Sequence, residues 1–102
     1  MATTKRRRPT ASESLFSELG FSPVEAENLR VRSNLMITLS QRIGQMGWTQ
    51  VEAARHLDVT QPRISDLVRG KIDRFSVDTL IAMLGAAGVE VNVSARLMRA
   101  SA

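Results

Sequence analysis

The stretch TQVEAARHLDVTQPRISDLVRG, residues 49–70, decides the fold expected for this chain. It predicts two short helices joined by a tight turn, because Thr49 and Thr60 are both of a residue type that caps helix N-termini. Asp58, between them, tolerates turn geometry and a left-handed backbone better than most residues. Gly70 stands where a left-handed residue ends a helix. The stretch therefore predicts a helix-turn-helix that begins at Thr49 and ends at Gly70.

Apolar side chains recur three and four positions apart in both halves of this stretch, which is the spacing of one helix face. The small side chain of Ala54 allows a second helix to approach closely, and Val59 in the turn can fill the space between the helices. Pro62 falls in the first turn of the second helix, where its missing N–H costs no hydrogen bond. The side chains that we expect to be buried are Ala53, Ala54, Leu57, Val59, Ile64, Leu67 and Val68.

The opposite face of the second helix carries side chains that can bond to DNA bases. Gln61 can bond to adenine, Asp66 can accept a hydrogen bond from cytosine, and Pro62 can contact a thymine methyl group. Arg69 can reach guanine or a phosphate, and the helix N-terminus itself favours a phosphate. This pattern predicts a helix that lies in the major groove of DNA. The alternative is an ordinary solvated face on a pair of helices.

These residues resemble the lambda-repressor-like helix-turn-helix family, the Cro/cI type that is also called XRE. The segment FSVDTLIAMLGAAGVEVNV, residues 75–93, is similar to the family's next helix and, more narrowly, to a branch that ends in a β-strand and includes HigA-like antitoxins. Asp58 replaces the glycine often found in the family's turn, and Ala53 replaces a larger apolar residue. The resemblance covers roughly residues 30–97. The matching residues are Thr49, Gln50, Ala54, Leu57, Val59, Thr60, Ile64, Ser65, Leu67, Arg69, Gly70 and Lys71.

The resemblance implies a mainly α fold, a lambda-repressor-like bundle of about five helices whose C-terminal β-strand pairs across a homodimer. It also implies two groups of residues that contact double-stranded DNA. The base-facing residues would be Gln61, Pro62 and Asp66. The residues near phosphates would be Gln50, Arg63, Arg69, Lys71 and Arg74.

Residues 89–97 alternate between apolar and polar side chains, which is the period of a β-strand. They follow a helix that we expect between Ser76 and Gly88. A lone strand leaves its backbone groups unpaired, so the expected partner is the same strand of a second copy, antiparallel across a two-fold axis. The alternatives are pairing with a short N-terminal stretch of the same chain and an extended coil. The apolar side chains of this dimer strand are Val89, Val91, Val93, Ala95 and Leu97.

Two features shape the N-terminal part. Residues 1–11 form a basic arm that we expect to be disordered alone; it either contacts DNA or is a solvated tail. The positive charge of this arm equals the net charge of the whole chain, which is +4. It comes from Lys5, Arg6, Arg7 and Arg8. The second feature is a group of apolar side chains, expected as a satellite of the core or, alternatively, as a docking surface for a protein partner. Its members are Leu15, Phe16, Leu19 and Phe21.

A long helix is predicted over residues 23–46. Ser22, Pro23 and Glu25 give a capping-box pattern with proline at the first helical position, and Gly47 can end the helix. Its apolar stripe consists of Leu35, Met36, Leu39, Ile43 and Met46.

Composition limits the remaining possibilities. The 102 residues suffice for one compact domain, which we place at residues 12–88, before the strand at 89–97 and a tail at 98–102. Cysteine is absent, and no apolar run has the length of a membrane span or of a signal segment, so a soluble cytoplasmic protein is expected. His56 has no second histidine or cysteine beside it, so we expect no metal, no cofactor and no catalysis. Trp48 is expected in the core.

These patterns predict a sequence-specific DNA-binding transcriptional repressor that acts as a homodimer on a palindromic operator. The resemblance implies that it is the autoregulating antitoxin of a type II toxin–antitoxin pair, with a small RelE-type toxin as its partner. The alternative is a stand-alone phage or host regulator of the XRE type.

Overall fold

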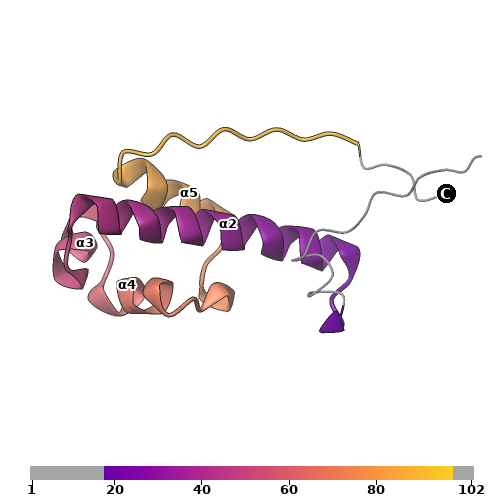
Figure 1. Cartoon of the computed structure of the whole chain (residues 1–102), viewed down its shortest axis with the longest axis horizontal. Helices are drawn as coiled ribbons and strands as arrows, with labels where there is room; N and C mark the ends of the chain where they lie inside the picture. Colours follow the sequence, from indigo (N-terminus) through magenta and orange to yellow (C-terminus); the bar gives the residue numbers. More distant parts are fainter. Residues whose placement is uncertain (1–17, 98–102) are drawn as a thin grey trace, which may run out of the picture.

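The computed structural model describes residues 18–97 of the chain. This part is mainly helical, and its elements are the α-helices α2 (Pro23–Met46), α3 (Gln50–Leu57), α4 (Gln61–Val68) and α5 (Val77–Ala86), with the short 3-10 helix η1 (Ile72–Arg74) between α4 and α5. In Figure 1, α2 runs along the long axis of the molecule, with α4 on one side of it and α5 on the other. The predicted helix over residues 23–46 is thus confirmed.

The start of α2 is fixed by a reciprocal pair of hydrogen bonds. The Ser22 backbone N–H donates to Glu25 Oε1 over 2.8 Å, and the Glu25 backbone N–H donates to Ser22 Oγ over 3.1 Å. Pro23 follows the cap, where no N–H is needed. At the other end, Gly47 has a left-handed backbone with φ of 69°. The capping box and the terminating glycine therefore form as predicted.

The turn between α3 and α4 also has the predicted geometry. Thr49 caps α3 in a second capping box with Glu52, through hydrogen bonds of 2.8 and 3.1 Å. Asp58 ends α3 in the left-handed region, with φ of 57°, a conformation that aspartate tolerates better than most residues. Thr60 then caps α4, where its Oγ1 accepts from the Arg63 backbone N–H over 3.3 Å. Gly70, with φ of 73°, follows the C-cap of α4.

One apolar core joins α2, α3, α4 and α5. Phe75, between η1 and α5, is buried in it and brings the chain back onto α2 and α4. Leu35, Trp48 and Val59 are half-buried against this core. The buried residues of the cluster are Met36, Leu39, Ile43, Ala53, Ala54, Leu57, Ile64, Leu67, Phe75, Leu80, Met83, Leu84 and Ala87.

Two side chains that were expected in the core are exposed. Val68 is 55% exposed, because Ile64 and Leu67 take the inward positions of α4 and Val68 lies about 100° further round the helix from Leu67. Met46, the last residue of α2, is exposed as well. Leu19 and Phe21 are also exposed, whereas Leu15 and Phe16 lie outside the described residues. Leu19 therefore does not contribute to the expected satellite of the core.

The segment after α5 runs as an extended coil beside the helices (Figure 1). Val89 and Val91 are half-buried against the core, whereas Val93 is 79% and Leu97 is 95% exposed. No β-strand occurs between residues 18 and 97, so the predicted strand at 89–97 stays a prediction that needs a partner strand. The basic arm at 1–11 and the tail at 98–102 lie outside the described residues.

The two capping boxes are expected to make the stability of the fold depend on pH. Hydrogen bonds from the backbone and then the side chain of Ser22 lower the pKa of Glu25, and those of Thr49 lower the pKa of Glu52 in the same way. A carboxyl whose pKa is lower in the folded state stabilises the fold above its unfolded pKa, and this stability is lost as the pH falls through the folded pKa. We expect urea unfolding, followed by circular dichroism, to show a larger stability advantage of wild type over the Glu25→Gln/Glu52→Gln variant at about pH 7 than at about pH 3. An equal difference at both pH values would contradict this.

Candidate nucleic-acid interface

The N-terminal end of α4 presents two predicted base-facing residues to solvent. Gln61 and Pro62 are the first two residues of α4, and both are exposed. Thr60 fixes this end of the helix through its cap, while Ile64 and Leu67 are buried beneath it. A polar and a rigid apolar side chain are thereby held on the outer side of a helix whose inner side cannot rotate without opening the core.

The third predicted base-facing residue, Asp66, already has a charged partner within the chain. Asp66 Oδ2 lies 3.4 Å from Nη1 of Arg74, which comes from η1, and the Asp66 side chain is only 19% exposed. The Arg74 side chain is 54% exposed. A carboxylate that faced a phosphate backbone alone would repel it, so a cation at this distance reduces that repulsion.

Arg63 has an internal role that the sequence did not reveal. Its Nη1 donates to the carbonyl oxygen of Arg74 over 2.7 Å, and its Cζ lies 5.2 Å from the ring centre of the buried Phe75. The planar guanidinium is suited to both contacts, since it can donate at its edge and stack with its face. The partners lie 11 and 12 positions further along the chain, too far for a helix-spacing rule to find them.

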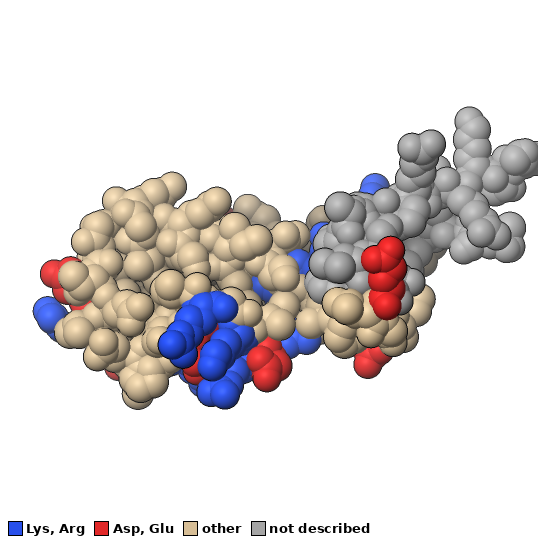
Figure 2. Space-filling view, turned by 60° about the horizontal axis from the view of Figure 1, so that its bottom comes forward, with Lys and Arg blue, Asp and Glu red and all other residues tan. Residues whose placement is uncertain are grey.

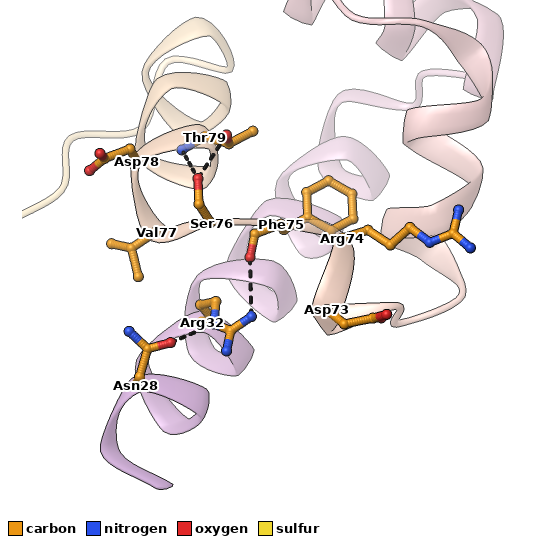
Figure 3. Close-up of a pocket in the computed structure, with 9 residues that line it drawn as sticks. All are labelled: Asn28, Arg32, Asp73, Arg74, Phe75, Ser76, Val77, Asp78 and Thr79. Atoms are coloured by element: carbon orange, nitrogen blue, oxygen red, sulfur yellow. Dashed lines mark hydrogen bonds between the residues drawn. The ribbon is translucent and has the colours of Figure 1, made fainter. Parts of the chain in front are cut away.

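Arg32 of α2 supports the same turn from the other side. Its Nη1 donates to the carbonyl oxygens of Ile72 (3.0 Å) and Phe75 (3.4 Å), and its Nε donates to Asn28 Oδ1 over 2.7 Å. Figure 3 shows Arg32 between Asn28 and Phe75 at an open hollow of about 510 Å³. The hollow is lined by Asn28, Arg32, Asp73, Arg74, Phe75, Ser76, Val77, Asp78 and Thr79. Sequence reasoning missed Arg32, because its hydrogen bonds to Ile72 and Phe75 span 40 and 43 positions.

Positive charge gathers on the α4 side of the molecule. Figure 2 shows Lys and Arg side chains clustered on this face, with acidic side chains beside and among them. Among the residues predicted near phosphates, Gln50 begins α3 and is exposed, as is Arg69 at the C-cap of α4, whereas Lys71 is half-buried. The structure thus places the predicted residues on α3, α4 and the turn that follows α4.

His56 and Trp48 form a separate contact. Their rings stack with centroids 4.2 Å apart and 10° between the planes. His56 is exposed, and Trp48, which was expected in the core, is half-buried against it. Nowhere between residues 18 and 97 do three or more His, Cys, Asp or Glu side chains gather in a way that could hold a metal ion. Across the same residues, none of the helices combines the length and the apolar character that crossing a membrane requires.

Comparison with known proteins agrees with this geometry. A family model described as a helix-turn-helix domain matches residues 15–96, which include every described helix. A search of curated proteins found no match.

Proposed function

The chain belongs to the helix-turn-helix domain family, and we propose on this ground that it is a DNA-binding regulator. More specifically, we propose a sequence-specific transcriptional repressor that works in the cytoplasm. The observation that carries the proposal is the capped helix α4, which buries Ile64 and Leu67 and turns Gln61 and Pro62 outward. A helix held in this way fits the major groove of B-DNA. A repressor occupies a promoter through such contacts and keeps polymerase from it.

The proposed contacts fall into two groups. Gln61, Pro62 and Asp66 face base edges, and Asp66 does so from beside Arg74. The contacts to phosphates come from residues around α4 that are polar or cationic. They are Gln50, Arg69, Lys71 and Arg74. The arm at Lys5, Arg6, Arg7 and Arg8 is proposed as a further contact to the DNA backbone.

A mobility-shift assay on the DNA upstream of the chain's own gene tests this function. We expect a shifted band that competitor DNA of unrelated sequence does not remove. The Arg69→Gln variant should shift less DNA at every salt concentration, because a phosphate contact is lost. Equal affinity of the wild-type chain for operator and unrelated DNA would contradict sequence-specific binding.

We propose further that the repressor is a homodimer joined by residues 89–97. In the described part of the chain this segment has no partner strand, and Val93 and Leu97 leave their apolar side chains in solvent. Antiparallel pairing with a second copy would satisfy the backbone groups and bury these side chains. Two α4 helices would then lie one DNA turn apart, roughly 34 Å, and read an inverted repeat.

The Val93→Asp variant tests the dimer without disturbing the protomer core, since Val93 is exposed in the single chain. Light scattering after size exclusion is expected to give a dimer for wild type and a monomer for Val93→Asp at micromolar concentration. Ser94→Asp adds the same charge on the other face of the strand and should stay dimeric. A wild-type monomer, or loss of the dimer in both variants alike, would refute this strand pairing.

The biological role that we propose is that of the autoregulating antitoxin in a type II toxin–antitoxin pair. The support is the resemblance of residues 75–93 to HigA-like antitoxins. Co-purification of a small RelE-type toxin encoded next to this chain would support it. If no such neighbour is bound, the chain is a stand-alone XRE-type regulator, and its DNA contacts are unaffected.

A further inference from the structure

The turn formed by η1 and Phe75 is held from two helices. Arg32 of α2 donates to the carbonyl oxygens of Ile72 and Phe75, and Arg63 of α4 donates to the carbonyl oxygen of Arg74. The Cζ atom of Arg63 also lies over the Phe75 ring, 5.2 Å from its centre. Within the turn, the Arg74 and Phe75 backbone N–H groups donate to the carbonyl oxygens of Lys71 and Ile72, over 3.0 and 3.2 Å. The main chain on both sides of the Arg74 side chain is therefore fixed to its neighbours.

The Arg74 side chain is what this fixed main chain presents to solvent. It is 54% exposed, and its guanidinium lies beside Asp66 on α4. In Figure 3 the Arg74 side chain extends away from Arg32. A cation carried on fixed backbone loses less conformational freedom on binding than one carried on a loose loop. The Arg74 guanidinium is thus positioned to bind an anion beside α4.

Arg63 is not free for the same task. Its hydrogen bond of 2.7 Å to the Arg74 carbonyl and its cation–π contact with Phe75 would both have to break before it could reach outward to a phosphate. Breaking a charge-assisted hydrogen bond would also leave the Arg74 carbonyl without this donor.

We propose that Arg63 is a positioning residue for DNA binding: it makes no phosphate contact itself, and it holds Arg74 where Arg74 contacts the phosphate. The inference rests on the proposed function, since it assigns roles within that DNA-binding surface. It corrects the expectation that both arginines contact phosphates independently.

Lysine at position 63 separates the two roles. Arg63→Lys keeps the positive charge but loses the planar group that both donates to a carbonyl and stacks on a ring. If Arg63 bound phosphate directly, lysine would retain most of the salt dependence. If Arg63 positions Arg74, Arg63→Lys should weaken DNA binding almost as much as Arg63→Gln does.

Fluorescence anisotropy of a labelled operator duplex, titrated from about 50 to about 200 mM salt, provides the measurement. We expect Arg63→Lys and Arg74→Gln each to weaken binding about tenfold, and each to reduce the slope of log K against log salt by about 0.9. The double variant should bind no more weakly than Arg74→Gln alone, because both changes remove the same contact. Combining Arg63→Lys with Arg69→Gln, the matched control, should multiply the two losses.

Three results would overturn the inference. They are wild-type affinity in Arg63→Lys, multiplied losses in Arg63→Lys/Arg74→Gln, and unchanged hydrogen exchange at the Arg74 and Phe75 amides in Arg63→Lys. All titrations are done well below the melting temperature of each variant, so general destabilisation does not enter the affinities. If the wild-type chain binds no duplex, the proposed function fails and this inference fails with it. Normal wild-type binding with an unaffected Arg63→Lys variant defeats the inference alone.

Discussion

Replacing Ile64 with alanine is expected to lower the free energy of unfolding by about 2–5 kcal/mol. Ile64 is fully buried in the core that α4 shares with α2, α3 and α5. The change removes apolar contacts and leaves a cavity that the capped helices around it cannot readily close. Urea unfolding followed by the fluorescence of Trp48, the single tryptophan, would measure the loss.

Val68→Ala is the matched control on the same helix. Val68 is 55% exposed, so we expect its replacement to change the free energy of unfolding by less than about 1 kcal/mol. Similar losses in the two variants would mean that the end of α4 is covered in solution, and that its exposed face is not the one described above.

Local signals in the sequence were sufficient for the helix ends. The capping box at Ser22, the cap at Thr49 and the left-handed Asp58 form as predicted, because each depends on hydrogen bonds or dihedral angles within four residues. The inward positions of α4 were harder, since a spacing of three and four leaves Leu67 and Val68 as near-equivalent candidates. Only the packed neighbours decide that Leu67 turns inward.

The electrostatic contacts of the candidate interface could not be predicted in this way. Arg63 lies close to Arg74 because the chain turns after Gly70, and Arg32 reaches Ile72 across 40 positions. No periodicity links residues so far apart, and the family resemblance placed Arg63, Arg69 and Arg74 alike near phosphates. The strand predicted at 89–97 has a different limit, because the partner strand that we propose for it belongs to a second copy of the chain.

Among the residues expected to contact bases, Gln61 is the polar side chain that is more exposed to solvent than Asp66 and better placed to contact a base. Unlike Asp66, which lies 3.4 Å from Arg74, Gln61 is exposed at the first position of α4. Its amide can donate and accept at once, which matches the N6 and N7 groups of adenine in the major groove. The cap at Thr60 fixes the backbone from which it projects.

Gln61→Ala is therefore expected to reduce discrimination at one base pair of each half-site by about 1–3 kcal/mol. The measurement is anisotropy titration against the operator and a set of duplexes that each carry one substituted base pair. Affinity for the duplex with the wrong base at that position should change little, because the wrong base makes no such contact with Gln61.

Arg69→Gln is the control, and it should weaken binding to all these duplexes by a similar factor and leave their ranking unchanged. If Gln61→Ala instead weakens every duplex equally, Gln61 contacts the backbone and the base-reading end of α4 must be assigned elsewhere. If the ranking changes at two adjacent base pairs, the side chain bridges them, and the preference at each is expected to be smaller than for a contact with one base.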